Sequence, residues 1–160
     1  MSNELNQVFK NATDQKNFYL KELRRCKDPV YFISNYIHIL TPKAQGGSSK
    51  FNLWDFQKDC IKDFEENRFN VVLKSRQIGM STLVSSYIIW LMLFHKNRNI
   101  LIVSIKREDS AELINKIKYA YEFLPSWIKN ISKPKSDNVH TFELDNYSKV
   151  SASSTTENMG

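Results

Sequence analysis

Residues 71–82 read VVLKSRQIGMST, and this stretch decides the fold that the sequence predicts. A short apolar, β-branched run, FNVVLK at 69–74, leads directly into it, and a very apolar helical run, TLVSSYIIWLMLF at 82–94, follows it. A strand, a short loop and a helix in this order present successive backbone N–H groups at a helix N-terminus, where the helix dipole favours negative charge. The layout is typical of a loop that binds nucleotide phosphates.

The usual phosphate-loop pattern, GxxxxGK[ST], is only partly present. When Gly79 and Ser81 are aligned with it, Met80 stands where the lysine belongs, and Lys74 stands at the first glycine. The phosphates need a cation and a ring of donors rather than a lysine at one fixed position. We therefore predict that Lys74 and Arg76 supply the positive charge and are the catalytic residues. The alternative is that this segment is merely a basic turn between a strand and a helix.

The same pattern assigns the other contacts of the loop. Ser81 stands where the motif places the hydroxyl that holds magnesium, so it is the predicted metal ligand. The loop residues expected to bind ATP are Ser75, Gln77, Ile78, Gly79, Met80, Ser81 and Thr82.

The bulk composition fits a folded domain that contacts polyanions. The chain has 160 residues, long enough for one ordinary domain, and 41% of them are hydrophobic, which excludes a disordered chain. The formal net charge of +6 favours DNA, RNA or nucleotides as partners. The two cysteines form no CxxC pair and fit buried free thiols in a reducing compartment. The longest apolar run, 83–94, is too short to span a bilayer, so we expect a soluble intracellular protein.

Hydrophobic patterning predicts alternating helices and strands, typical of an α/β sheet. Asp28-Pro29 is a favourable helix start. We expect a polar helical arm over 3–26, helices over 30–40, 53–67, 82–94 and 107–123, strands over 69–74 and 100–105, a loop over 42–50, and a hairpin of 140–146 with 148–154. Glu143 and Asp145 fall on one face of that hairpin, where a solvated strand face is favoured over a metal pair.

SRQIGMST resembles the ATPase loop of the large terminase subunit of tailed bacteriophages, in which an Arg-Gln pair precedes the glycine and the loop lysine is displaced to the position of Lys74. FNLWDFQKDCIKDF at 51–64 resembles the family's segment in which an aromatic-Gln pair contacts adenine. Phe56-Gln57 matches that pair, with Trp54 or Phe56 packing against the base, because a glutamine amide both donates and accepts. Ordinary core packing is the alternative for these residues.

Three further segments extend the resemblance over about residues 20–160 and are found at 24–39, 100–128 and 142–160. The resemblance implies an α/β phosphate-loop NTPase fold of the helicase and terminase type, with a parallel sheet and a helical N-terminal region. The N-terminal arm would lie at 1–27 and an incomplete ATPase domain at 28–160. The family's acidic pair and its nuclease domain would lie beyond Gly160.

The same resemblance implies the function. ATP and Mg²⁺ would be the cofactors of a DNA-packaging ATPase in virion assembly, working in the host-cell cytoplasm with no membrane. Its partners would be double-stranded DNA, the portal protein and the small terminase subunit, in a homo-oligomeric ring. Two alternatives stay open: a helicase-like ATPase of another kind, and a basic nucleic-acid-binding or assembly module without nucleotide chemistry.

Overall fold

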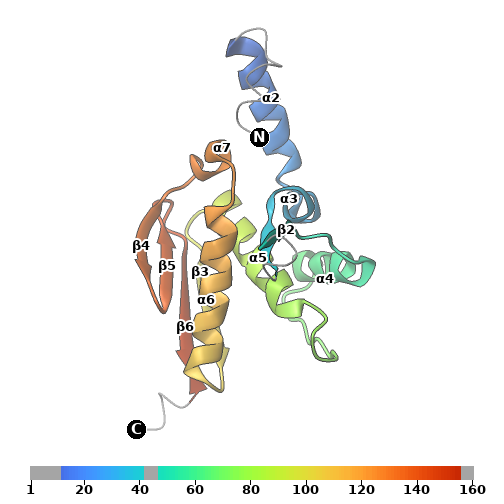
Figure 1. The fold of residues 1–160 in the computed structure, drawn as a ribbon, viewed down its shortest axis with the longest axis vertical. Coiled ribbons are helices and arrows are strands. Elements are labelled where there is room, and N and C mark those ends of the chain that lie inside the picture. The colour runs from blue at the N-terminus through green and yellow to red at the C-terminus, as the bar shows by residue number, and fades with distance from the viewer. Residues whose placement is uncertain (1–11, 42–46, 156–160) are drawn as a thin grey trace.

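A mixed sheet and the helices packed beside it form the framework of the molecule (Figure 1). The structure is a computed structural model that describes residues 12–41 and 47–155. Its helices are α2 (Ala12–Arg25), α3 (Pro29–Tyr36), α4 (Asp55–Glu66), α5 (Met80–Phe94), α6 (Arg107–Glu122) and α7 (Ser126–Lys129). Its strands are β1 (His38–Leu40), β2 (Ser48–Lys50), β3 (Asn99–Ser104), β4 (Pro134–Asn138), β5 (Thr141–Leu144) and β6 (Lys149–Ser154).

The sheet has the strand order β3-β6-β5-β4. Among the described strands only β3 and β6 run parallel, with Ile100 opposite Val150, while β6–β5 and β5–β4 are antiparallel. Phe142 and Val150 are buried and oppose each other across β5 and β6, which fixes the register of that pair. The expected hairpin is confirmed, and the fold is mixed α/β. The expected parallel sheet is found only in part: one strand pair is parallel and the other two are antiparallel, because β5 is joined to β4 and to β6 by short turns.

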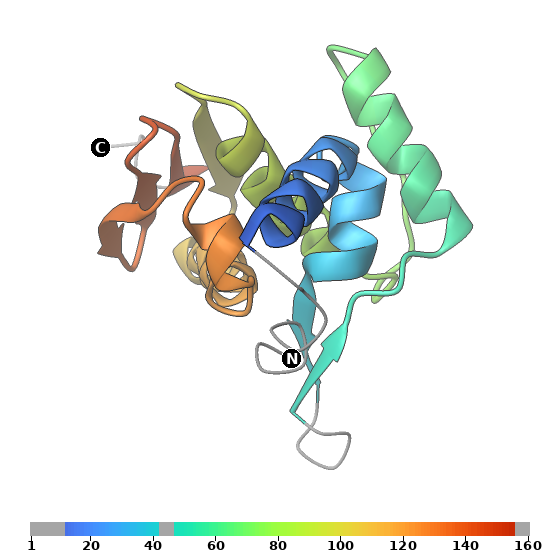
Figure 2. The same ribbon diagram turned by 90° about the horizontal axis from the view of Figure 1, so that it is seen from above.

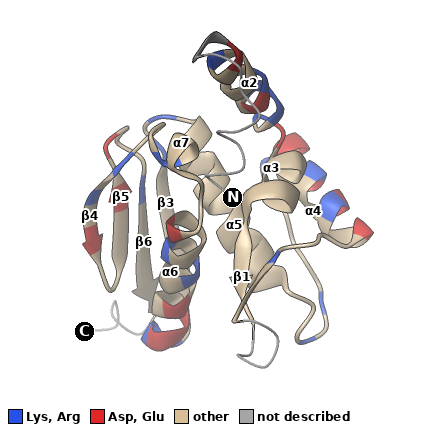
Figure 3. Ribbon diagram, turned by 45° about the horizontal axis from the view of Figure 1, so that its top comes forward, with Lys and Arg blue, Asp and Glu red and all other residues tan. Residues whose placement is uncertain are grey.

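Helix α5 occupies the centre of the molecule. It carries no charged residue, and its side chains are buried along most of its length, Leu83, Ile89 and Met92 completely. It packs against α6, α3 and α4, while α6 in turn packs on β3 and β6. Seen from above (Figure 2), the sheet and α4 lie at opposite ends of the molecule, with α2 and α3 between them. Figure 3 shows Lys, Arg, Asp and Glu residues on α2, α4 and α6, whereas α5 has none.

The predicted start of α3 is confirmed, but its predicted end is wrong. Asp28 Oδ1 accepts a hydrogen bond from Val30 N at 2.8 Å, and Pro29 occupies the first turn. The helix then ends at Tyr36, and residues 38–40, which were expected to be helical, form β1 instead. They pair with β2 in an antiparallel hairpin. The apolar run at 30–40 predicted a longer helix, but pairing with residues 48–50 makes its last residues a strand.

The expected strand at 69–74 is also wrong. This segment forms no strand and pairs with none among the described residues, and Val71 and Leu73 are fully exposed. A strand needs a neighbour to satisfy its backbone groups, and an apolar β-branched run alone does not provide one. On β3, which forms one edge of the sheet, Leu101 and Val103 are likewise exposed. Strand β4 was not anticipated, because the sequence PKSDN lacks an apolar alternation.

Helix α2 confirms that the described part of 3–26 is helical, and residues 1–11 lie outside the described residues. It projects from the body at one end of the molecule (Figure 1). Its C-terminal half is nevertheless docked, since the Tyr19 and Trp127 rings stack with centroids 5.5 Å apart. The described residues contain no helix with both the length and the hydropathy needed to cross a membrane. Cys26 is a buried free thiol as expected, whereas Cys60 is only partly buried.

The carboxylate of Glu22 fastens α2 to α3. It is 6% exposed and accepts hydrogen bonds from Tyr36 Oη at 2.7 Å, Tyr31 Oη at 2.8 Å and Arg25 Nη1 at 2.8 Å. Burial by itself would raise the pKa of Glu22, but the hydrogen bonds from Tyr36, Tyr31 and Arg25 outweigh it and lower that pKa. The ionised carboxylate therefore stabilises the folded state.

We expect Glu22→Gln to lower the free energy of unfolding by about 1–3 kcal/mol at pH 7, because three donors lose a charged acceptor. The pKa of Glu22 is lowered in the folded state, so its contribution is complete above the unfolded value of about 4.3 and is lost as pH falls through the folded value. Urea titrations should therefore show a smaller difference between variant and wild type at acid pH than at pH 7.

Glu66→Gln is the matched control, because Glu66 is exposed on α4. It should change the free energy of unfolding by less than about 0.5 kcal/mol. A loss from Glu22→Gln that is the same at both pH values would contradict the role given to the ionised carboxylate.

Candidate functional site

The loop at residues 75–79 turns sharply into α5. Gln77 and Gly79 both have positive φ angles, 63° and 75°, and Gly79 is the N-cap residue of the helix. Its carbonyl oxygen accepts the first helical hydrogen bond, from Leu83 N at 2.9 Å. A glutamine in the left-handed region is uncommon and persists only where its surroundings hold it. The turn before α5 thus contains two left-handed residues, whereas the turns at Asn97 and Tyr147 contain one each.

The side chain of Gln57, on α4, is hydrogen-bonded to this loop. Gln57 is 2% exposed, and its Nε2 donates to the carbonyl oxygen of Ile78 at 3.1 Å. Its Oε1 accepts from Trp54 N at 3.1 Å, which satisfies a free N–H at the start of α4. A Cβ placed on Gly79 would lie 3.0 Å from Gln57 Nε2, so the loop and the amide are in close contact. The amide thus joins α4 to the loop through two hydrogen bonds.

This structural role of Gln57 was not predicted from the sequence. A signal for it existed, since Gln57 stands three residues after the residue that precedes α4, the capping-box position. The amide points inward, and its polar groups already have protein partners. Contact between Gln57 and adenine therefore stays a prediction, and it would require the amide to rearrange or to use its second N–H and lone pair.

The cations of the loop point to solvent. Lys74, Ser75, Arg76 and Gln77 are all exposed. Lys74 Nζ has only a long contact with the carbonyl oxygen of Ser75, at 3.5 Å. Within residues 12–41 and 47–155, no carboxylate forms an ion pair with Lys74 or Arg76. Two positive charges without an acidic partner in the described part of the chain therefore lie at the start of the turn.

Met80 stands where the usual motif has its lysine, and its side chain is buried in the core, 6% exposed. A lysine side chain following the same path would bring its ammonium group into apolar surroundings. Ser81, the next residue, is exposed, and Thr82 is half-buried. A lysine at position 80 would therefore be buried, and any cation that binds a ligand at this loop would have to come from another position.

Trp54 and Phe56 provide the exposed aromatic surface near the loop. Trp54 is 59% exposed and Phe56 is 39% exposed, with ring centroids 5.4 Å apart and planes inclined by 59°. The backbone of Trp54 is bonded to Gln57, which is in turn bonded to Ile78. The structure therefore brings the predicted base-binding segment and the predicted phosphate loop together.

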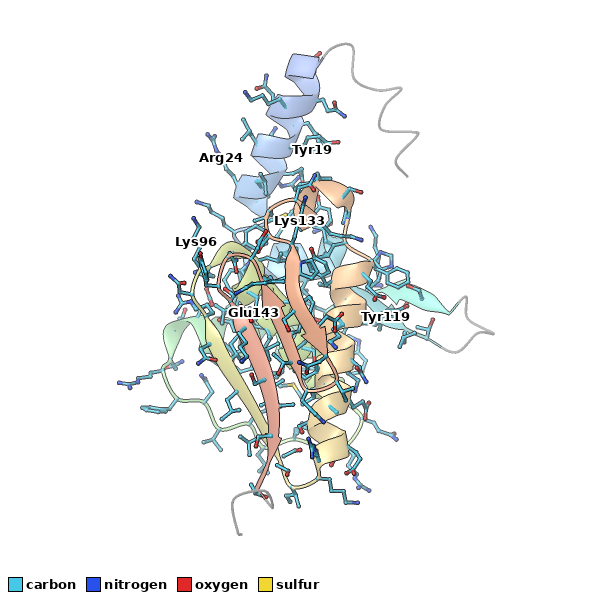
Figure 4. The ribbon with its side chains drawn as sticks, turned by 90° about the vertical axis from the view of Figure 1, so that its left-hand side faces the viewer. Tyr19, Arg24, Lys96, Tyr119, Lys133 and Glu143 are labelled. Carbon is cyan, nitrogen blue, oxygen red and sulfur yellow. The ribbon has the colours of Figure 1, made fainter. Side chains whose placement is uncertain are left out.

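The carboxylates of the β-hairpin have protein partners. Glu143 accepts from Lys135 Nζ at 2.8 Å, and this hydrogen bond lowers the pKa of Glu143. Asp145 Oδ1 accepts from Ser132 Oγ at 2.6 Å and from Lys133 N at 3.0 Å (Glu143 and Lys133 are labelled in Figure 4). No cluster of three His, Cys, Asp or Glu side chains suited to a metal ion occurs in the described part of the chain. The structural interpretation of these two carboxylates is favoured over a metal pair.

A single exposed hydroxyl fits Mg²⁺ only as part of a larger ligand set. Ser81 lies in the first turn of α5, and no acidic residue lies in that turn. Magnesium commonly keeps several waters and takes ligands from substrate phosphates. Ser81 can therefore supply one oxygen to a metal that arrives with a nucleotide.

A comparison of the chain with models of known protein families finds no match. The resemblance to terminases therefore depends on the motif residues of the sequence alone.

We expect Gly79→Ala to destabilise the protein by about 1–2 kcal/mol through its left-handed backbone and by about 1 kcal/mol more through displacement of Gln57 from Ile78. Gly47→Ala is the matched control: Gly47 has a similar φ of 73°, but an added Cβ would meet nothing within 4 Å. Urea unfolding should therefore show a larger loss at Gly79.

The double variant Gly79→Ala with Gln57→Ala tests the cause. In the Gln57→Ala background, Gly79→Ala should lower the free energy of unfolding only by about as much as Gly47→Ala does in the wild type. The reference for this loss is the single variant Gln57→Ala. Equal losses at the two glycines in the wild-type background would show that Gln57 does not constrain the loop.

Proposed function

We propose that residues 74–82 bind the triphosphate of ATP with Mg²⁺, and that the protein is the ATPase portion of a DNA-packaging motor similar to the large terminase subunit. The observation that supports this most directly is the exposed loop, with positive φ at Gln77 and Gly79, that opens into the N-terminus of the 15-residue α5. Such a turn directs backbone N–H groups outward, where the helix dipole adds positive potential.

Charge at the loop supports the same ligand. Lys74 and Arg76 are exposed and have no acidic partner in the described part of the chain, so both are available to phosphate oxygens. In the proposal they stabilise charge that develops on the outer phosphate oxygens. Ser81 contributes a ligand to Mg²⁺, which would neutralise phosphate charge when bound.

The base would lie against the aromatic surface of Trp54 and Phe56. Both rings are exposed, and both belong to the segment that Gln57 ties to the loop. If the loop moves when phosphate binds, the hydrogen bond from Gln57 to Ile78 would shift the Gln57 amide. The hydrogen bond between Gln57 and Trp54 N would then pass this shift to the start of α4. Gln57 would therefore have two roles: it holds the loop, and it contacts adenine once a nucleotide is bound.

The resemblance to the large terminase subunit and the net charge of +6 support a role in DNA packaging. Double-stranded DNA would be the translocated substrate, with the portal protein, the small terminase subunit and further copies of the chain as partners in the host-cell cytoplasm. A helicase-like ATPase of another kind would use the same loop chemistry.

We expect Lys74→Ala to weaken ATP binding roughly 10- to 100-fold, because a hydrogen bond to a charged group contributes about 1.5–3 kcal/mol. Met80→Leu should change it less than about threefold, since a volume-conserving core change is tolerated. Titration with a fluorescent ATP analogue and Mg²⁺ measures both.

Lys96→Ala is the matched charge control, because Lys96 is exposed in the turn after α5 (labelled in Figure 4). It removes one positive charge without touching the loop and should leave ATP affinity nearly unchanged. Similar losses from Lys74→Ala and Lys96→Ala would instead support a basic module whose binding follows overall charge.

The two roles of Gln57 predict different nucleotide dependence. Removing the amide loosens the loop, so Gln57→Ala should weaken ATP and GTP alike. Loss of an adenine contact should weaken ATP by a further factor of about ten. Paired titrations with ATP and GTP measure this difference, and a wild type that does not distinguish them would remove the adenine assignment while leaving the loop assignment intact.

A further inference from the structure

Three segments that are far apart in the sequence meet at one end of the sheet. They are the turn at 95–98 between α5 and β3, residues 132–135 at the start of β4, and residues 145–149 between β5 and β6. Asn97 N donates to the carbonyl oxygen of Asn146 at 3.2 Å, and Asp145 N donates to the carbonyl oxygen of Lys133 at 2.8 Å. These contacts join the three segments into one surface region, which we call the Tyr147 surface after its exposed aromatic residue.

Tyr147 has a backbone conformation that is uncommon for a bulky residue. Its φ angle is 66°, in the left-handed region, and its N–H donates to the carbonyl oxygen of Leu144 at 3.1 Å to close the turn. Hairpin turns of this kind usually have glycine at the left-handed position, because a side chain there is strained. Tyr147 is 71% exposed, so its ring contributes little to the core. A strained side chain without a packing role is typical of a functional position.

Buried polar groups hold the turns at 95–98 and 145–148 against each other. Ser148 is fully buried, and its Oγ donates to the carbonyl oxygen of His95 at 2.9 Å. Asn146 Nδ2 donates to the carbonyl oxygen of Met92 at 2.7 Å, while Asn146 Oδ1 accepts from Ser148 N at 2.9 Å. The position of Tyr147 is therefore fixed by the residues before and after it, and its ring is presented to solvent from a firmly held turn.

Lysine side chains lie around the exposed ring. The four lysines of the surface, all of them exposed, are Lys96, Lys133, Lys135 and Lys149. Lys135 Nζ is 5.8 Å from the centre of the Tyr147 ring, within the range of a cation–π interaction. Figure 4 shows Lys96 and Lys133 at the same end of the sheet. Lys149 begins β6, two residues after Tyr147.

Positive charges outnumber negative charges on this surface. Two carboxylates lie among the four lysines, and both have protein partners. Glu143 pairs with Lys135 at 2.8 Å, and Asp145 accepts hydrogen bonds from residues 132 and 133. The other three lysines form no ion pair within the described residues. Four lysines against two carboxylates leave an excess of two positive charges, so the surface attracts an anionic ligand.

An exposed ring surrounded by lysines fits single-stranded nucleic acid. The ring offers a base a surface on which to stack, and the lysines attract the phosphates on both sides of that base. In a duplex the bases are already stacked on one another, so the ring is of use only to a single strand. An acidic peptide would pair with the lysines but would leave the strained ring without a role.

We propose that the Tyr147 surface binds single-stranded nucleic acid, with one base stacked on Tyr147 and the neighbouring phosphates bound by its lysines. Lys135 stays beside the ring and paired with Glu143. The surface contains no residue of the proposed nucleotide loop, so the proposal does not rest on ATPase activity.

Fluorescence anisotropy of the full chain with two matched probes tests the proposal, in samples that contain no ATP. One probe is an oligothymidylate of about 12 nucleotides, and the other is an abasic strand of the same length, which keeps the phosphates but has no bases. The wild type should bind the oligothymidylate roughly 5- to 30-fold more tightly, the gain expected from stacking one base. Tyr147→Gly should abolish this preference and leave the affinity for the abasic strand nearly unchanged.

A lysine variant and a second aromatic variant are the controls. Lys149→Ala should weaken both probes alike and lower the slope of log affinity against log salt by about 0.7, the value for one phosphate contact on a single strand. Phe69→Ala should leave both affinities unchanged. Phe69 is 82% exposed and has Arg68 over its ring at 5.2 Å, but it follows Glu65 and Glu66 closely in the sequence.

A wild type that binds the two probes equally well, or binds neither, would overturn the proposal. So would a Tyr147→Gly variant that keeps the preference, or a Phe69→Ala variant that loses it. A thermal melt separates binding from folding. The Tm of Tyr147→Gly should stay close to that of the wild type, because relief of the left-handed strain offsets the greater freedom of the unfolded chain. A clear drop would show that the ring supports the fold, which also contradicts the proposal.

Discussion

The burial of α5 is the constraint on which the rest of the structure depends. A 15-residue helix without a charged side chain cannot leave any broad face in water, and each large apolar side chain contributes about 1.5–3 kcal/mol when it is buried. Helices α3, α4 and α6 cover it from different sides, and α6 connects it to the sheet. Trp90 at its centre is buried and also donates a hydrogen bond to the carbonyl oxygen of Cys26 at 2.9 Å, which links it to the chain just after α2. The positions of the other helices follow from the need to enclose α5.

The geometry of the loop at residues 75–79 depends on the same helix. Because α5 is fixed in the core, its N-terminus is also fixed, and the residues before it must reach the surface within one tight turn. Met80 is the first helical residue and points into the core, whereas Ser81 points out. The left-handed backbone at Gly79 makes this change of direction, and Gln57 holds the turn against α4. The buried core thus begins at Met80, immediately after the left-handed residue Gly79 of the loop.

Much of this arrangement could be predicted from local sequence. The start of α3 follows from Asp28-Pro29, and α5, α6 and β3 follow from apolar runs or stripes of the right period, since these signals involve neighbouring residues. The failures involve partners distant in the chain. Residues 38–40 form a strand because residues 48–50 pair with them, and residues 69–74 form none because no described strand pairs with them. The inward bonds of Gln57 and the clustering of lysines around Tyr147 likewise depend on three-dimensional packing, which one-dimensional patterns do not contain.

The three tryptophans give the molecule a set of built-in optical probes. Trp90 is 2% exposed within the core, Trp127 is partly buried against Tyr19 and Tyr36, and Trp54 is 59% exposed beside the loop. Indole emission shifts to longer wavelength as the ring meets water, so the red edge of the spectrum comes mainly from Trp54 and the blue edge from Trp90. Quenching by a dissolved small molecule therefore samples the surface beside Gln57 selectively. The core helix and the loop can be observed separately in one unlabelled sample.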